Sequence, residues 1–404
     1  VRSIGGRIRE IRVWRDITLK ATAELAGITE SYLSRIERNE RPVNSRAVLE
    51  GIAAALRVAP AELAGQAFPP ATVDPVASEI QAAVIALDAT LSDYQLGEPT
   101  GETARLWPAV AADLNRLNTV LRPAADYAAI GVLLPGLMTE LHTLNVTDPQ
   151  HRVDVCEALM GCYHTAGVLL KNLGICGLPS LAAFRAQQVA EKLDDPAWLG
   201  LAAWLRAQTM AGKGRQRALA MSMQGAHELE PHLDDPRAAQ VYGMLHLNAA
   251  LATAAMRRTD DCADHLNEAA AMAGRVNCGT GRGFANLYFG PDNVGIWRLS
   301  IAVELGETGR AREIARLVDP SRVPSALRQA DFWADLGRGM AQQRATRDAA
   351  VGTLLRAETI APQHIRSNPF VRETIADLLR RTPRDAATGR DLRGMAYRMG
   401  IGVG

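Results

Sequence analysis

The segment Ile17–Glu37, ITLKATAELAGITESYLSRIE, decides the fold of the N-terminal region. Its pattern predicts two short helices joined by a tight turn at Gly27, because glycine adopts a left-handed backbone at little steric cost. Thr18 and Thr29 each stand where a helix would begin, and threonine caps helices by accepting a hydrogen bond from a free backbone N–H. Ala23 is small enough to let the two helices cross closely. The outer face of the second helix is polar and carries Glu30, Ser31, Ser34, Arg35 and Arg38.

Residues 4–64 resemble the repressor-type helix-turn-helix domain of the Xre/Cro family. The sequence AELAGI followed by SYLSRIERNERP, within Ala23–Pro42, is close to the usual sequence of that family. Thr22 departs from it, because an aliphatic residue is usual there, and Asn39 replaces the usual glycine after the second helix. Asparagine tolerates a left-handed backbone, so the helix can still end at this point. The alternative interpretation is an ordinary helical hairpin with no role in DNA binding.

The resemblance implies that the second helix lies in the major groove of double-stranded DNA and contacts base edges. Arg35 and Ser31 are expected to read the DNA sequence, because arginine can donate two hydrogen bonds to guanine. Lys20, Arg38 and Arg41 are expected mainly to position phosphates. The predicted DNA-contact residues are Lys20, Thr29, Glu30, Ser31, Tyr32, Ser34, Arg35, Arg38 and Arg41.

Three further helices are expected around this pair, which would complete a five-helix domain. Isoleucines at one-face spacing predict a helix before the pair, Ser45 can cap a fourth helix, and a short fifth helix closes the unit. The resemblance also implies an ion pair between Arg12 and Glu37, which would tie the first helix to the second helix of the pair. The alternative is two solvated charges on separate faces.

Charge is nearly balanced over the 404 residues, at +1, but it is unevenly distributed. Residues 1–65 carry 11 Lys and Arg against 8 Asp and Glu, whereas the remainder carries 34 against 36. The basic excess lies where phosphate contacts are expected. Alanine and arginine are abundant, aromatic residues make up 5%, and convincing strand patterns are absent. We therefore expect an all-α chain.

A proline-rich stretch, 68–75, divides the chain. Its prolines stop the preceding helix, and everything after it has the pattern of helix following helix. We expect a helix-turn-helix DNA-binding domain over 1–68, a linker over 69–75, and a helical-repeat sensor and dimerisation domain over 76–404.

The second region contains a weak internal repeat. Four helix openings begin with a turn residue and a charge, and each places an alanine in its first turns: Ala218, Ala263, Ala311 and Ala350. Their spacings of 45, 48 and 39 residues exceed the ~34 of the tetratricopeptide repeat. The segments nevertheless resemble a degenerate form of that repeat, in which helix pairs pack through alanines. The resemblance implies a tetratricopeptide-like α-solenoid with a concave inner surface.

Two later stretches, Gly290–Glu304 (GPDNVGIWRLSIAVE) and Ser367–Arg381 (SNPFVRETIADLLRR), resemble actinobacterial regulators that join an Xre-type head to a repeat body. This order is also similar to that of the peptide-pheromone regulators of Gram-positive bacteria. The resemblance implies a peptide or small-molecule effector in the concave groove. Because one small head contacts few bases, we also expect a homodimer, assembled through the repeat body, that binds an inverted repeat.

The segment Val276–Trp297, VNCGTGRGFANLYFGPDNVGIW, concentrates glycine and aromatic residues in an alanine-rich region. A nucleotide-binding loop, an inter-repeat loop and a ligand-facing loop are all open interpretations. Gly279, Gly281 and Gly283 alternate, but no complete phosphate-binding motif is present. Amide side chains can hold a peptide backbone, because each offers a donor and an acceptor. The predicted effector-binding residues are Tyr242, His246, Asn248, Asn286, Asn293, Trp297 and Arg298.

Other classes of function receive little support. The sequence contains no GxSxG or HExxH motif, so we expect neither an enzyme nor a cofactor. The five cysteines form no CxxC pair and suit buried positions in a reducing cytosol, so no metal is expected, although Cys156, Cys162 and His164 are an alternative metal site. No signal peptide or membrane-length apolar run is visible, which favours a cytoplasmic protein without membrane contact. The alternative function is a scaffold whose repeats recruit a partner protein while the head anchors it on DNA.

Overall fold

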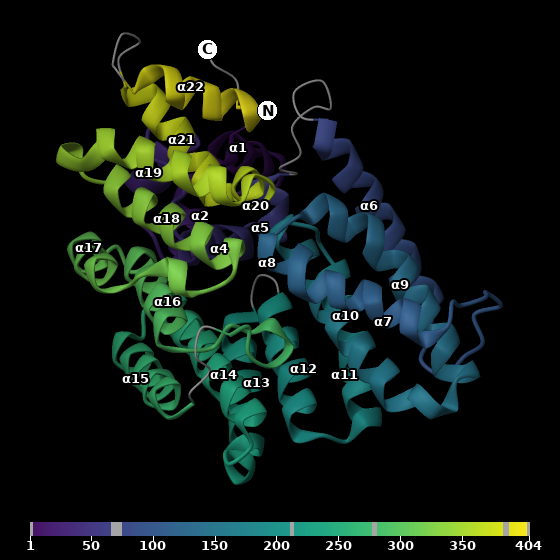
Figure 1. Ribbon diagram of the computed structural model, residues 1–404. Coiled ribbons are helices and arrows are strands. Elements are labelled where there is room, and N and C mark those ends of the chain that lie inside the picture. The colour runs from purple at the N-terminus through teal and green to yellow at the C-terminus, as the bar shows by residue number, and fades with distance from the viewer. Residues whose placement is uncertain (1–2, 66–74, 211–213, 277–280, 383–387, 402–404) are drawn as a thin grey trace.

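The computed structural model describes residues 3–65, 75–210, 214–276, 281–382 and 388–401 (Figure 1). Within these ranges the regular secondary structure is helical and contains no strand, so the all-α expectation is confirmed. Residues 69–74 of the predicted linker lie outside the described ranges. The predicted boundaries at 68 and 76 therefore stay predictions.

The N-terminal region consists of five helices. These are α1 (Ile4–Trp14), α2 (Leu19–Ala26), α3 (Glu30–Glu37), α4 (Arg46–Ala55) and α5 (Pro60–Ala64). Their inward side chains, among them Ile8, Leu33 and Ile52, form one buried apolar cluster. The predicted five-helix domain is present.

The rest of the described chain, called the body below, is a series of stacked helices. Its helices are α6 (Pro75–Asp93), α7 (Trp107–Arg116), α8 (Arg122–Ala124), α9 (Tyr127–Thr147), α10 (Arg152–Asn172), α11 (Leu178–Leu193), α12 (Pro196–Thr209), α13 (Arg215–Leu229), α14 (Pro236–Ala255), α15 (Thr259–Arg275), α16 (Pro291–Glu304), α17 (Thr308–Leu317), α18 (Ala326–Ala341), α19 (Arg347–Ile360), α20 (Pro362–Ser367), α21 (Pro369–Arg381) and α22 (Gly389–Arg398). From α10 to α19 each helix packs on the next, and α10, α12, α14, α16 and α18 also pack on one another in turn. These five form an inner layer, with α11, α13, α15, α17 and α19 outside it, as in a solenoid.

The four helix openings found in the sequence are the starts of α13, α15, α17 and α19, which all belong to the outer layer. Ala218, Ala311 and Ala350 are buried, as packing through alanines requires. Ala263 is exposed, and the neighbouring Cys262 takes the inward position in α15. The sequence therefore locates the repeating unit correctly, with a shift of one residue in α15.

The last helices of the body return to its first helices and close the array into a ring (Figure 1). The backbone N–H of Tyr127, at the start of α9, donates to Gln363 Oε1 on α20 at 2.6 Å. The Tyr127 hydroxyl lies 3.2 Å from His364 Nδ1. Ser367 Oγ donates to the carbonyl oxygen of Asn172 at 3.2 Å. The inner layer therefore surrounds a central space instead of lining an open groove.

One helix of the described ranges, α9, is long and apolar enough to cross a membrane, judged by length and composition alone. More than half of its most apolar stretch, 56%, is buried inside the protein. Leu134, Leu137, Met138 and Leu141 lie in the main apolar core of the body. In this fold α9 is a core helix.

Candidate DNA-binding surface and effector cavity

The two central helices of the N-terminal domain begin at the residues that the sequence predicts. Thr18 Oγ1 accepts a hydrogen bond from the backbone N–H of Ala21 at 3.1 Å, at the start of α2. Thr29 Oγ1 accepts one from the backbone N–H of Tyr32 at 3.2 Å, at the start of α3. Gly27 ends α2 with φ of 68°, in the left-handed region. The predicted caps and turn are confirmed.

Both departures from the usual family sequence are accommodated. Thr22 is buried, and its hydroxyl donates to the carbonyl oxygen of Thr18 at 3.0 Å, so the polar group has a partner. Asn39 adopts φ of 60°, as expected for asparagine in place of glycine. Gly5 allows α1 to approach α3 closely, because a Cβ there would lie 2.0 Å from the carbonyl oxygen of Ile36.

A largely buried ion pair holds α1 against α3. Arg12 Nε and Nη2 donate to the two carboxylate oxygens of Glu37 at 2.6 and 2.8 Å. Arg12 Nη1 donates to the carbonyl oxygen of Ile17 at 3.0 Å. The two side chains of the pair are 15% and 6% exposed, and the hydrogen bonds from Arg12 to Glu37 raise the pKa of the guanidinium. The ion pair that the resemblance implies is confirmed.

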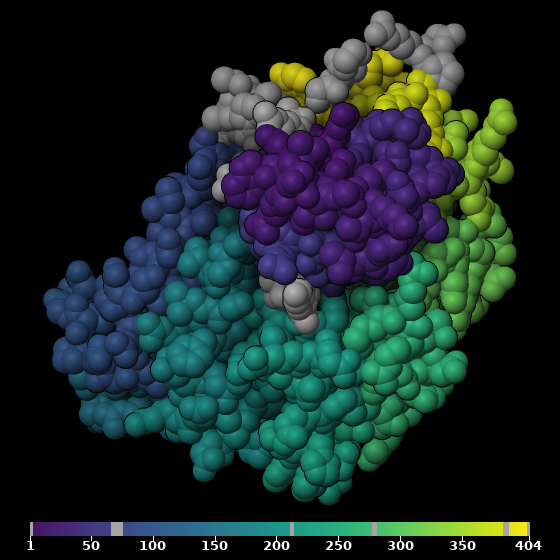
Figure 2. All heavy atoms as spheres, turned by 180° about the vertical axis from the view of Figure 1, so that it is seen from behind, coloured from purple at the N-terminus to yellow at the C-terminus, as the bar shows by residue number. Residues whose placement is uncertain are grey.

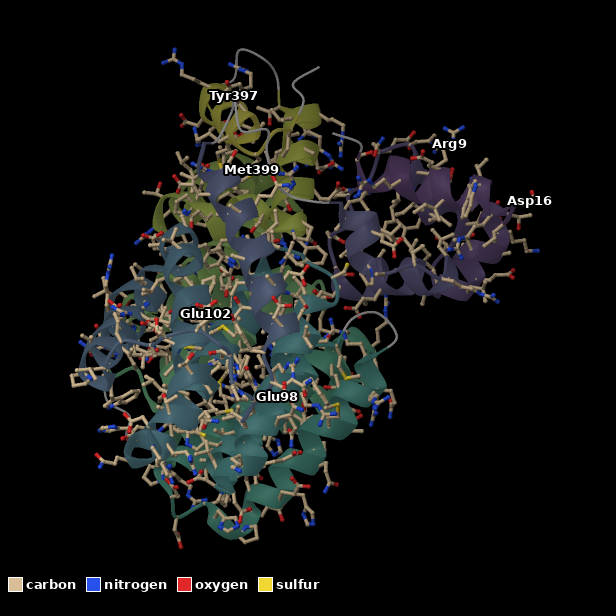
Figure 3. All side chains as sticks on the ribbon, turned by 90° about the vertical axis from the view of Figure 1, so that its right-hand side faces the viewer. Arg9, Asp16, Glu98, Glu102, Tyr397 and Met399 are labelled. Carbon is tan, nitrogen blue, oxygen red and sulfur yellow. The ribbon has the colours of Figure 1, made fainter. Side chains whose placement is uncertain are left out.

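The predicted DNA-contact residues divide into two groups by exposure. Six are exposed: Lys20, Thr29, Glu30, Ser31, Arg38 and Arg41. Tyr32, Ser34 and Arg35 are half-buried, and Arg35 Nε donates to the carbonyl oxygen of Ser31 at 3.3 Å. Figure 3 shows Arg9 and Asp16 on the side of the domain that points away from the body.

The comparison with known proteins agrees with this local geometry. Residues 3–65 match the family model of a helix-turn-helix domain. No curated protein and no solved structure matches the chain. Together, the match and the geometry support a DNA-binding regulator, and residues 3–65 are called the head below.

The head docks on the body through the N-terminal half of α4. The Glu304 carboxylate, at the end of α16, accepts a hydrogen bond from the backbone N–H of Ala47 at 3.1 Å and one from Arg46 Nη1 at 3.3 Å. A carboxylate is favoured at this place by the partial positive charge of a helix N-terminus. Farther along α4, Glu50 Oε2 accepts from Arg215 Nε at 2.7 Å. Two ion pairs therefore hold α4 on the body.

The C-terminal helices hold another side of the head. Phe370, from α21, joins the apolar cluster of the head. Burial raises the pKa of the Glu373 carboxyl, while hydrogen bonds from the backbone N–H groups of Ile4 and Val43 oppose that rise. Figure 2 shows the head seated on the body, with body helices on both sides of it and below it.

A crevice of about 310 Å³ separates the recognition helix, α3, from the body. Tyr32, Arg35 and Arg41 line its head side, and residues of α18 and α21 line its body side. Arg338 Nη2 bridges the two parts nearby by donating to the carbonyl oxygen of Asn44 at 2.8 Å. Three predicted DNA-contact residues therefore face protein across a narrow gap.

A central cavity of about 380 Å³ lies inside the ring, and every helix of the inner layer contributes to its wall. The lining includes Lys171 of α10, Trp204 of α12, Asn248 of α14, Trp297 of α16 and Arg328 of α18. Arg46 of the head reaches the same cavity, as do Arg122 of α8 and Phe370 of α21. The head therefore forms part of the wall of the central cavity.

The carboxylates of the cavity are engaged by cations. Asp331 Oδ2 accepts from Arg328 Nη1 at 2.9 Å, and Asp331 Oδ1 lies 2.7 Å from His364 Nε2. Burial alone would raise the pKa of Asp331, but His364 and Arg328 outweigh it and lower the pKa. Asp335 Oδ1 accepts from Arg338 Nη1 at 2.5 Å. Neither carboxylate is left to bind a cationic ligand.

Two cations of the cavity, by contrast, have only neutral acceptors among the described residues. Arg122 donates to Asn118 Oδ1 at 2.9 Å and to the carbonyl oxygen of Ala285 at 3.0 Å. Lys171 Nζ donates to Gln208 Oε1 at 2.5 Å. Burial lowers the pKa of Arg122 to about 10 and that of Lys171 to about 8.

The structure brings some predicted effector-binding residues together and separates others. The cavity is lined by Asn248, Asn286, Asn293 and Trp297. Tyr242, His246 and Arg298 do not line it. The Tyr242 hydroxyl donates to Glu268 at 3.1 Å, and His246 Nδ1 lies 3.3 Å from His265 Nδ1, so both face α15. Spacing in the sequence did not separate the two faces of α14.

The cavity cations Arg46, Arg122 and Lys171 are not among the residues predicted to bind the effector. Lys171 carried a usable signal, because the chain has four lysines and this one directly follows the apolar run VLL in a helix. Arg46 and Arg122 carried none, because they reach the cavity from elements far away in the sequence.

The cysteines considered as metal ligands have other surroundings. Cys156 Sγ donates to Asn145 Oδ1 at 3.4 Å, and burial raises the pKa of the Cys162 thiol to about 12. His164 Nδ1 lies 3.2 Å from Arg122 Nη2. In the described part of the chain, no group of three or more His, Cys, Asp or Glu side chains is placed to hold a metal ion.

Proposed function

We propose that the chain is a sequence-specific transcription regulator with an Xre-type head and a tetratricopeptide-like body that binds an effector. The observation that carries this proposal is the recognition helix, which Thr29 caps after the turn at Gly27 and whose polar face includes Ser31 and Arg35. A helix presented in this way fits the major groove, where arginine pairs with guanine. Such a protein acts where bacterial DNA is, in the cytoplasm.

The central cavity supports effector binding by the body. Its volume, about 380 Å³, falls within the range of about 300–1,000 Å³ that is typical of small-molecule sites. The closed ring and the docked head favour a small molecule or a very short peptide over a long extended peptide. The alternative of a recruiting scaffold needs an accessible inner surface, and here the head covers part of it.

The docked head offers a route from the cavity to DNA. Arg46 lines the cavity and also pairs with Glu304, so an effector beside Arg46 contacts the head and the body together. Docking also places Tyr32 and Arg35 opposite α18 and α21. An effector that binds the docked and undocked arrangements differently shifts their balance. A coupling of about 1–3 kcal/mol is sufficient for this kind of control.

The proposal includes a homodimer assembled through the body, because two heads on a two-fold axis match an inverted repeat. Light scattering of the full chain tests the dimer, and a monomer at micromolar concentration would contradict it.

Sequence-specific DNA binding is tested by selecting sites from random duplex DNA with the full chain. We expect enrichment of an inverted repeat with two similar half-sites. If no sequence is enriched even at low salt, where phosphate contacts are strongest, the proposed function is wrong.

A further inference from the structure

Three buried hydrogen-bond donors in residues around the central cavity have no partner among the described residues. They are Trp204 Nε1, Trp297 Nε1 and Arg328 Nη2, and all three residues line the cavity. A buried donor without a partner is costly, and native structures contain few of them. Three such donors belong to residues of one cavity wall, which is compatible with a ligand that offers hydrogen-bond acceptors.

The charges around the cavity favour the same kind of ligand. Arg122 and Lys171 contact neutral acceptors, whereas Asp331 and Asp335 are engaged by cations. The cations that dock the head, including Arg46, are also paired with carboxylates. The excess charge of the wall is therefore positive and belongs to Arg122 and Lys171.

The walls between these polar groups are apolar and aromatic. Trp204, Met244 and Leu251 contribute to them. Lys171 lies seven residues after His164, the neighbour of Arg122, on the same helix. This separation is two helical turns, or about 10 Å along the axis. The cavity therefore offers positive charge at two places with an apolar surface nearby.

Resting on the proposed effector function, we propose that the central cavity binds a small organic anion, a carboxylate or phosphate ester with an apolar portion, and that Lys171 and Arg122 supply the positive charge that holds it. Lys171 has an exposed side chain, but that side chain lines the cavity and protein surrounds it. With its pKa lowered to about 8, Lys171 is still mostly protonated at pH 7 and can pair with an anion.

The test uses the full chain and four probes of similar shape. Phenylacetate and phenyl phosphate carry the proposed anionic groups, phenylacetamide is uncharged, and phenethylammonium is cationic. Binding is followed by calorimetry and by the shift in melting temperature at pH 7. We expect one or both anions to bind, and the difference between them separates carboxylate from phosphate recognition. We expect the amide and the cation to bind at least tenfold more weakly.

Two variants locate the binding. Lys171→Met is expected to weaken anion binding at least tenfold, and Lys192→Met, the same change at an exposed lysine on α11, is expected to leave it unchanged. Arg122→Met is expected to weaken it as well. If Arg122→Met fails to fold, Lys171→Met still decides the outcome, because Lys171 hydrogen-bonds only Gln208 among the described residues.

The anion proposal is overturned if neither anion binds at millimolar concentration, if the amide binds as tightly as the anions, or if the two lysine variants behave alike. If the amide binds and Lys171→Met does not weaken that binding, the body still contains an effector site, but that site does not select anions. Selection of DNA sites by the full chain is measured separately, so a failure of the proposed regulator is distinguished from a failure of the anion site.

Discussion

The head and the central cavity differ in whether the cations that protein surrounds have carboxylate partners. In the head, the Arg12 guanidinium makes two hydrogen bonds to the Glu37 carboxylate, whose side chain is 6% exposed. In the cavity, Arg122 and Lys171 contact only amide and carbonyl oxygens among the described residues. A paired charge in the interior holds two elements together, whereas an unpaired cation costs the fold stability. The first arrangement serves structure, and the second serves the binding of an anion.

Breaking the pair in the head should have the largest effect. Glu37→Ala leaves the Arg12 guanidinium largely buried without its partner, which typically costs about 3–5 kcal/mol. We expect the head to unfold at much lower urea concentration and its α1 and α3 amides to lose protection in hydrogen exchange. Because Arg12 and Glu37 bond each other within the head, the body amides should change less than those of the head.

The matched control is an exposed pair in the same domain. Arg38 Nε lies 2.8 Å from Glu40 Oε1, and the two side chains are 56% and 51% exposed. Exposed pairs contribute about 0–1 kcal/mol, so Glu40→Ala should cost little. Similar losses in the Glu37 and Glu40 variants would show that the buried pair has no special role.

The body also contains buried ionisable groups that are kept neutral, and they predict a loss of stability in acid. Burial lowers the pKa of His142 and of His246 to about 4. The unfolded chain binds protons at these residues below about pH 6.5, whereas the folded chain does not until about pH 4. Stability is therefore present above pH 6.5 and lost below it, by about 2 kcal/mol for each histidine between pH 7 and pH 5.

Urea unfolding of the body at pH 7 and pH 5 measures this loss. His246→Gln should reduce the difference in the free energy of unfolding between pH 7 and pH 5 by about 2 kcal/mol, the contribution of one histidine. His227→Gln, at a side chain that is 75% exposed, should leave the difference unchanged. A pH difference that is the same in both variants would contradict the assignment.

On the recognition helix, α3, the charge of Arg35 should determine sequence specificity. Arg35 projects from the recognition helix, and a bidentate contact with guanine contributes about 1–3 kcal/mol of discrimination. Arg35→Ala should relax the preference at one base position, whereas Lys20→Ala should weaken binding to all sequences alike. Binding of each variant to selected and to random duplexes distinguishes the two. Equal losses on both DNAs for Arg35→Ala would remove its reading role.

The two regions also differ in how far the sequence predicts them. The features of α2 and α3, from the cap at Thr18 to the turn at Asn39, lie within 22 consecutive residues, so local capping and turn preferences specify them. Cavity residues such as Arg46, Lys171 and Arg328 meet because the ring closes and the head docks on it, and no local pattern encodes either event. The sequence composition pointed to Asn248, Asn286 and Asn293, which line the cavity. The cations of the cavity were not predicted.

Weakening the contact between head and body should change DNA affinity by less than the Arg35 substitution changes base discrimination. Glu304→Gln keeps the shape of the side chain but removes the charge that holds Arg46 and the backbone N–H of Ala47. A loss of about 1 kcal/mol in docking raises the undocked population up to about fivefold. DNA affinity should rise by up to that factor, because docking places Tyr32 and Arg35 opposite the body.

Glu307→Gln is the matched control, because Glu307 forms an ion pair within the body, with Arg310 on the outer helix α17. The Glu304 variant should also bind the anionic probes more tightly, since Arg46 then adds an unpaired cation to the cavity. A fall in DNA affinity in Glu304→Gln would mean that the docked arrangement is the one that binds DNA.

The smallest effect on stability is expected at Lys171, the cavity cation that hydrogen-bonds only an amide oxygen among the described residues. Burial lowers its pKa from 10.5 to about 8, so the folded chain releases this proton at lower pH than the unfolded chain does. Stability should therefore rise as the pH increases from about 8 towards 10, because the unfolded state then binds more protons.

Lys171→Met removes this rise, and at pH 7 it exchanges an unfavourable charge for the loss of one hydrogen bond to Gln208. We expect its stability at pH 7, measured by urea unfolding, to equal or slightly exceed that of the unmodified chain. A large loss at pH 7, comparable to that of Glu37→Ala, would show that Lys171 is a structural charge, and the distinction between the cation of the head and the cations of the cavity would not hold.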